Sequence, residues 1–148
     1  IEASDRLKEK KIEHTVVYIA EPGKFREARN DGEAEFVAFS NTRGAIIPEN
    51  INNLVIASHT RPEVMLGTLQ PLWNGKNIKA LGFINQGGTL GVDDMLFVNK
   101  CSWAHILLSA CQLAGIDPYG ILDDQELDAL HSKTSPDGII TKRRRSSS

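Results

Sequence analysis

The chain has 148 residues and a mass of 16.3 kDa, the size of one domain, which excludes a multi-domain enzyme unless the chain is part of a longer polypeptide. Hydrophobic residues make up 41% and charged residues 24%, a balance that excludes collagen, coiled coil and a mostly disordered chain. No apolar run approaches the roughly 20 residues of a membrane span, and the first residues lack the pattern of a signal peptide. We therefore expect a cytoplasmic domain that does not bind a membrane.

Positive charge gathers at the C-terminal end of the chain. Residues 142–145 supply four of the 17 Lys and Arg side chains, which leaves 13 against 19 acidic residues over 1–141, a balance of −6. Such an acidic body argues against a nucleic-acid partner. We predict an α/β domain over residues 1–131, followed by a flexible loop and basic tail over 132–148, with nuclear targeting or RNA contact as the alternative role of the tail.

The first half of the chain alternates between helical and strand-like patterns. Residues 1–12 hold good helix formers with few apolar positions and predict the latter part of a surface helix. Residues 14–20 are β-branched and aromatic and stop at a Glu-Pro-Gly sequence, which predicts a buried strand. A helical turn or two is expected over 33–39. The apolar run over 53–58 predicts a second short strand.

The sequence Thr60-Arg61-Pro62-Glu63 matches a helix capping box with proline in the first turn. It predicts a helix over residues 61–72 that ends at Asn74-Gly75. Residues 78–83 then form a third strand. Strand, helix and strand at this spacing indicate a mainly parallel sheet covered by helices, with right-handed crossovers.

Three helices are expected in the second half. Asp93 or Asp94 can cap a helix over 93–99, while Ser102 and Gly115 can begin and close an apolar helix over 102–115. Residues 123–130 predict a final amphipathic helix with acidic residues in its first turn.

Candidate catalytic and metal-binding residues are sparse. Cys101 and Cys111 give no disulfide framework and predict buried thiols. Cys101 and His105 share a helical face, but the other histidines have no spacing that recruits them, so a buried thiol beside a half-buried histidine is favoured over a metal site. No nucleophile motif is present, and we predict no catalytic residue in this chain.

The sequence Gln86-Gly87-Gly88-Thr89-Leu90-Gly91 follows a predicted strand and precedes a predicted helix. It fits neither the dinucleotide nor the phosphate-loop pattern, and it is either a tight turn that needs glycine or a loop that brings polar atoms to a neighbour or substrate. His59 follows the preceding strand, and parallel strands end at one edge of the sheet. The candidates for a substrate edge or interface are His59, Asn85, Gln86, Gly87, Gly88 and Thr89.

Residues 3–114 resemble, in order and type, the C-terminal domain of the phosphoketolase family, which is related to transketolase. The sequence HTVVYI resembles the family's V-R-V-V-N-V strand, and VIASH resembles its apolar strand that runs into a histidine at the start of a helix. The sequence ALGFINQGGT corresponds to the family's G-Y-K-E-x-G-T segment. Asp94-Met95 and the apolar run 106–108 follow, as they do in the family.

This resemblance implies a three-layer αβα domain of the transketolase C-terminal kind. The parent enzyme would cleave xylulose 5-phosphate or fructose 6-phosphate with phosphate to give acetyl phosphate, using thiamine diphosphate and magnesium held in other domains. The partners implied are those domains and further copies of the enzyme. Ile84 stands where the family has a lysine that reaches the sugar phosphate, so a non-catalytic role in assembly and in shaping the active-site edge is expected.

Two alternatives remain open, one from the residues and one from the resemblance. The chain can be a free-standing α/β interaction or regulatory module, or the same domain of another transketolase-like enzyme. In either case the isolated chain is expected to be inactive. The edge that carries His59 should face a partner, with Leu90, Met95 and Trp103 as the expected apolar contact patch.

Overall fold

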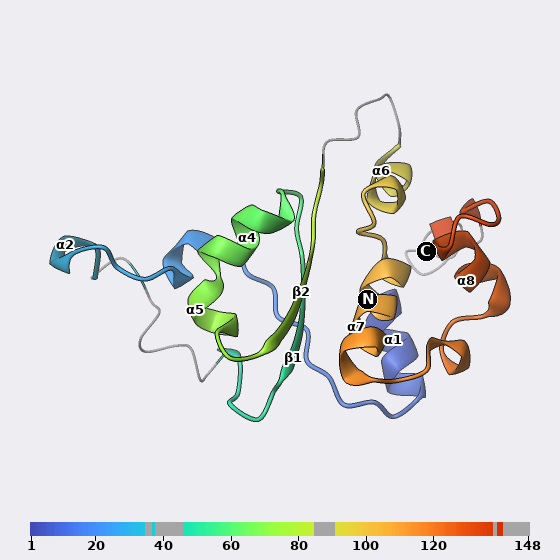
Figure 1. Cartoon of the computed structure of the whole chain (residues 1–148), viewed down its shortest axis with the longest axis horizontal. Helices are drawn as coiled ribbons and strands as arrows, with labels where there is room; N and C mark the ends of the chain where they lie inside the picture. The colour runs from blue at the N-terminus through green and yellow to red at the C-terminus, as the bar shows by residue number, and fades with distance from the viewer. Residues whose placement is uncertain (35–36, 38–45, 85–90, 138, 141–148) are drawn as a thin grey trace.

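The computed structural model describes residues 1–34, 37, 46–84, 91–137 and 139–140 (Figure 1). None of the helices in these ranges combines the length and the apolar character that crossing a membrane would require. The helices and strands follow one another as α1 (Glu2–Glu9), η1 (Pro22–Phe25), α2 (Asp31–Ala34), β1 (Asn53–Ala57), α4 (Pro62–Thr68), α5 (Gln70–Trp73), β2 (Asn77–Leu81), α6 (Val92–Val98), α7 (Trp103–Ala114), η2 (Pro118–Gly120) and α8 (Asp124–Leu130).

The sheet of the described chain consists of β1 and β2, paired in parallel. Asn53 lies opposite Asn77 at one end of the ladder, and Ala57 lies opposite Leu81 at the other. The connection through α4 and α5 lies on one side of the sheet, and α7 lies on the other side (Figure 1). The predicted α/β class with parallel strands is therefore confirmed in its coarse form.

The prediction of a buried strand over residues 14–20 is wrong. The segment belongs to neither a helix nor a paired strand, and the side chains of Val16 and Tyr18 are 73% and 92% exposed. Its first residue is held beside α1, because His14 Nε2 lies 2.7 Å from Ser4 Oγ and Nδ1 lies 2.8 Å from the carbonyl oxygen of Ile12. β-branched residues favour an extended backbone, but they do not select the strand with which it pairs.

The single helix predicted over 61–72 is interrupted at Leu69, which ends α4 and precedes α5. Pro71 lies in the first turn of α5. A proline inside a continuous helix would lack a hydrogen bond to the preceding turn and would clash with the carbonyl of Gly67, four residues earlier. Two short helices meeting at Leu69 avoid both penalties.

The main core surrounds α7, with residues from the following segments and from α8. Ser102 caps α7 at its start, and Gly115 closes it in the left-handed conformation with φ of 68°, as the sequence predicts. Cys101 and Cys111 are free and buried, which confirms the prediction for both thiols. The buried hydrophobic cluster comprises Ala104, Leu107, Cys111, Ile121, Leu122, Leu127, Ala129 and Ile139.

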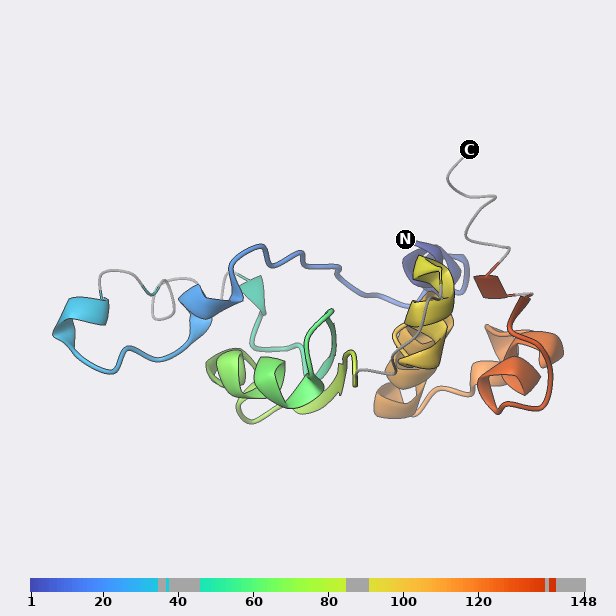
Figure 2. The same cartoon turned by 90° about the horizontal axis from the view of Figure 1, so that it is seen from above.

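A long projection leaves this body near the end of α1. Seen from above, residues 13–34 run away from α7 and α8 and carry η1 and α2 outward (Figure 2). At its outer part, Glu33 accepts hydrogen bonds from the Arg26 and Arg29 guanidinium groups and holds a compact turn. The pKa of the Glu33 carboxyl lies well below its ordinary value because both guanidinium groups stabilise its charged form.

Candidate functional site

The carboxyl ends of β1 and β2 meet at one edge of the sheet, the edge at which open parallel sheets commonly bind ligands. Ser58, His59 and Thr60 leave β1 there. Phe83 follows β2, and its ring centroid lies 5.1 Å from that of His59, with the two rings inclined at 64°. His59 is exposed to solvent, so its imidazole is available to a partner group while Phe83 supports it on one side.

The turn that presents His59 is braced by backbone and hydroxyl hydrogen bonds. The Ser58 N–H donates to the carbonyl oxygen of Leu81 at 3.0 Å, and the Phe83 N–H donates to that of Thr60 at 3.0 Å. The hydroxyl oxygens of Ser58 and Thr60 lie 3.1 Å apart. His59 therefore stands on a turn tied directly to the chain that leaves β2.

Gly82 allows this close approach of the two chains. A Cβ atom at this position would lie 2.1 Å from the carbonyl oxygen of Thr60 and 2.9 Å from the ring of Pro62. Only a residue without a side chain fits against the turn without displacing it.

Asn99 fixes the chain on the other side of the edge. Its Oδ1 accepts from the Ile84 N–H at 2.9 Å, and its Nδ2 donates to the carbonyl oxygen of Met95 at 3.0 Å. The side chain is buried, so the segment that follows β2 is attached to the end of α6. Sequence reasoning missed Asn99, because nothing in the local pattern indicates a bond to a residue 15 positions earlier.

The remaining predicted edge residues are Asn85, Gln86, Gly87, Gly88 and Thr89, and they lie outside the described residues, as does Leu90 of the expected apolar patch. Met95 is half-buried. Trp103 does not belong to an exposed patch, since its indole Nε1 donates to the carbonyl oxygen of Ile139 at 3.1 Å and its ring packs against the core. The prediction for Trp103 is therefore wrong, and the patch as a whole, which includes Leu90, stays a prediction.

Cys101 and His105 have the environment of packed core groups. Burial raises the pKa of the Cys101 thiol and, together with the positive charge of Lys100, lowers the pKa of His105 to about 4. His105 Nδ1 lies 2.7 Å from Ser102 Oγ, and its ring meets Phe97 edge-on. Within the described ranges, no group of three or more His, Cys, Asp or Glu side chains is arranged to hold a metal ion.

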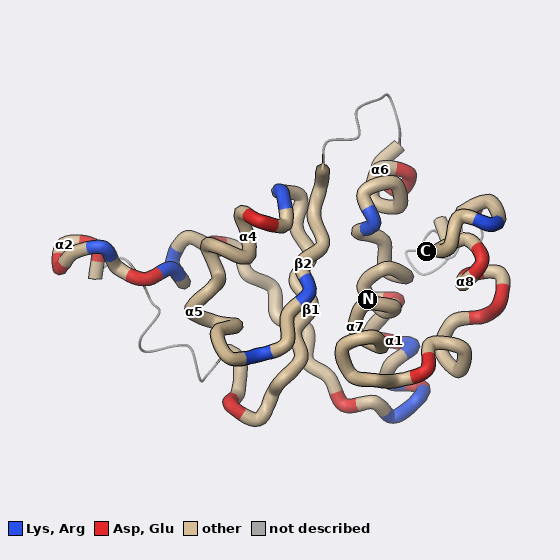
Figure 3. The backbone as a smooth tube through the Cα atoms, in the orientation of Figure 1, with Lys and Arg blue, Asp and Glu red and all other residues tan. Residues whose placement is uncertain are grey.

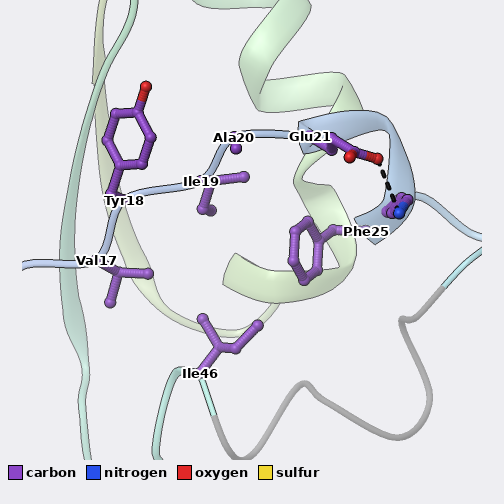
Figure 4. Close-up of a pocket in the computed structure, with 8 residues that line it drawn as sticks. Val17, Tyr18, Ile19, Ala20, Glu21, Phe25 and Ile46 are labelled. Atoms are coloured by element: carbon purple, nitrogen blue, oxygen red, sulfur yellow. Dashed lines mark ion pairs between the residues drawn. The ribbon is translucent and has the colours of Figure 1, made fainter.

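A second candidate site is a hollow of about 340 Å³ on the projection (Figure 4). Its wall is mostly aliphatic and aromatic, and Glu21 and Lys24 are paired with each other at 2.8 Å. The hollow suits apolar contact better than acid–base chemistry. It is lined by Val17, Tyr18, Ile19, Ala20, Glu21, Lys24, Phe25 and Ile46.

Comparisons of this chain with models of protein families, with curated proteins and with solved structures gave no match.

Proposed function

We propose that this chain is a non-catalytic C-terminal domain of a thiamine-diphosphate-dependent phosphoketolase-like enzyme, in which it serves assembly and shapes the edge of the active site. The observation that carries the proposal is the meeting of His59 and Phe83 at the carboxyl edge of the parallel pair. These residues lie in two of the segments that carry the family resemblance. Their contact is what a common edge of two parallel strands would produce.

The described residues support a role beside the reacting groups rather than among them. Ser102 and His105 are buried, so a substrate does not reach this hydroxyl–imidazole pair. His59 is exposed on a braced turn, where it can donate or accept a hydrogen bond at a domain boundary. Thiamine diphosphate and magnesium are assigned to other domains of the parent enzyme, because the resemblance locates their motifs there.

A second candidate is the same domain of another transketolase-like enzyme, and one position favours it. Ile84 is 57% exposed and replaces the lysine that reaches a sugar phosphate in the family. An aliphatic side chain offers no charge to a phosphate group. An enzyme that transfers a two-carbon ketol unit to a different acceptor is consistent with this replacement.

A third candidate, a free-standing interaction module, is favoured by the exposed apolar side chains of Val16 and Tyr18. The mass of the native polypeptide, detected with an antibody against this chain, distinguishes the free-standing module from the two enzyme-domain candidates. A polypeptide several times longer that contains thiamine-enzyme sequence supports the domain. A native polypeptide limited to about this chain would overturn the domain assignment.

Activity distinguishes the two enzyme readings. The native polypeptide should release acetyl phosphate from xylulose 5-phosphate or fructose 6-phosphate with phosphate, thiamine diphosphate and magnesium, and the 148-residue chain alone should not. Ketol transfer without acetyl phosphate would favour the second candidate. In the native enzyme, His59→Ala should lower activity and leave the unfolding midpoint unchanged, whereas a fall in the midpoint would make His59 structural.

A further inference from the structure

The segment over residues 15–19 has the composition of a strand but lacks a strand's partner. No backbone hydrogen bond joins these five residues to any other described residue. The side chains of Val16, Val17 and Tyr18 are 73%, 45% and 92% exposed. Exposed β-branched and aromatic side chains on an unpaired backbone are the features of a strand that pairs with another chain.

The outer edge of β1 offers a complementary row of backbone groups. The Ser58 N–H donates to Leu81, and the Asn52 carbonyl oxygen accepts from Asn77. In a parallel ladder, every second residue of a strand directs its N–H and C=O toward the same neighbouring strand. Leu54 and Ile56 therefore direct their backbone groups toward β2. Val55 and Ala57 direct theirs toward the opposite edge, where they have no hydrogen-bond partner among the described residues.

β1 also lacks the charges and prolines usual at a free edge, although residues 15–19 of its own chain cross it. Natural sheets guard such edges with charged residues, prolines or bulges. β1 contains no charged residue (Figure 3) and no proline, and the same holds for the segment 15–19. The two elements match in length, since β1 has five residues.

Within one chain, the ends of the segment prevent this pairing. His14 is held against α1 at Ser4 Oγ, and η1 packs against α4. Between these anchors the segment passes on the side of β1 that is turned away from β2, and it runs across β1 instead of along it (Figures 1 and 4). A segment running across a strand cannot form a ladder with it.

We propose that two copies of this chain exchange these elements. In the dimer the η1–α4 contact opens, residues 15–19 leave their path across the β1 of their own copy, and they pair with the outer edge of β1 in the other. Each sheet then gains a third strand, and the two contacts are equivalent, as a two-fold dimer requires. The pairing covers the apolar side chains of Val16 and Tyr18. The inference does not rest on the proposed enzyme family, since it uses only this chain's own edge and segment.

Sedimentation of the full chain over a range of concentrations tests the dimer. Val16→Lys and Tyr18→Asp should each raise the dimer dissociation constant tenfold or more. Val92→Lys and Tyr119→Asp are the matched controls, because these residues are 70% and 69% exposed on α6 and η2; neither should change the constant. A monomer at every concentration, or an equal effect of the controls, would overturn the proposal.

Amide hydrogen exchange locates the contact. The amides of Val55 and Ala57 should exchange slowly in the dimer and at least tenfold faster after dilution to the monomer, while the amide of Ser58, bonded to Leu81, should stay protected in both. Protection of Val55 and Ala57 in the monomer would mean that the segment pairs within its own chain and would contradict the exchange. Unprotected amides in a stable dimer would contradict the edge as the interface.

Discussion

Arg6 and Glu126 lie 120 positions apart and form a bidentate ion pair, with Nη1–Oε1 and Nη2–Oε2 distances of 2.9 Å. Glu126 is 2% exposed. Arg6 also donates to the carbonyl oxygen of Ile121 at 3.1 Å, and its guanidinium lies 4.7 Å from the centroid of the Trp103 ring. Pairing with Glu126 raises the pKa of Arg6, and the contacts together connect α1 to α7 and α8. The first helix is thus attached to the core by a charge that has little access to water.

Glu126→Gln should lower the free energy of unfolding by about 2 kcal/mol, because it removes the charge of a buried carboxylate and leaves Arg6 with Glu2, at 3.0 Å on α1, as its remaining counter-charge. Asp124→Asn changes an exposed carboxylate on the same helix and should cost less than about 1 kcal/mol. Urea unfolding of the full chain measures both. Equal losses for the two variants would show that the buried Arg6–Glu126 pair contributes no more to the free energy of unfolding than an exposed carboxylate does.

The caps of α8 and α4 give a second prediction, since two similar sequence signals behave differently. Asp123 accepts from the Glu126 N–H at 2.8 Å, and Glu126 accepts from the Asp123 N–H at 3.0 Å. Asp123→Ala should therefore cost about 1 kcal/mol. Thr60 makes no cap bond to α4, whose N-cap is Arg61, so Thr60→Ala should stay within about 0.5 kcal/mol. Thermal or urea unfolding measures both variants. A loss of about 1 kcal/mol or more for Thr60→Ala would show that Thr60 does cap α4.

The contrast explains which parts of the fold could be predicted from the sequence. At Asp123 the local signal and the tertiary contacts agree, because Glu126 serves the cap and the ion pair with Arg6 together. At Thr60 the carbonyl oxygen accepts from Phe83 and the hydroxyl lies against Ser58, and these contacts around the sheet edge displace the capping arrangement. Local patterns predict an element well where its long-range bonds do not compete.

The site follows the same rule. That His59 and the chain after β2 share an edge could be inferred from parallel pairing alone. The role of Asn99 could not, because its bond to the Ile84 N–H depends on how α6 returns to the sheet. Residues 14–20 carry the propensity of a strand, but the anchor at His14 decides their path.

The third prediction is that alanine at Gly82 and alanine at Gly67 change the free energy of unfolding in opposite directions. Gly82→Ala places a methyl group on the Thr60 carbonyl and should cost about 2 kcal/mol or more through overpacking. Gly67 lies inside α4 with no atom within 4 Å of an added Cβ, so Gly67→Ala should stabilise by about 1 kcal/mol through helix propensity. Denaturant midpoints measure both changes. A neutral Gly82→Ala would mean that the turn carrying His59 can move.

The last prediction concerns pH and rests on His105. Its pKa is lowered to about 4 in the folded chain by burial and by Lys100, against about 6.5 for an unperturbed histidine. Between these values the unfolded chain binds a proton that the folded chain does not, so stability from the neutral imidazole is complete above pH 6.5 and is lost as the pH falls toward 4. The loss amounts to about 3 kcal/mol, since one pKa unit corresponds to about 1.4 kcal/mol.

Urea unfolding at several pH values between 4 and 7 measures this dependence. His105→Asn should unfold more easily at pH 7 but lose less stability on acidification than the unchanged chain, because the titrating group is gone. His131→Asn, which removes an exposed histidine, is the matched control, and the difference in slope between the two variants is assigned to His105. If the two variants have the same slope, the His105 imidazole is protonated at no cost in the folded chain, and the buried, neutral state derived from Ser102, Phe97 and Lys100 is wrong.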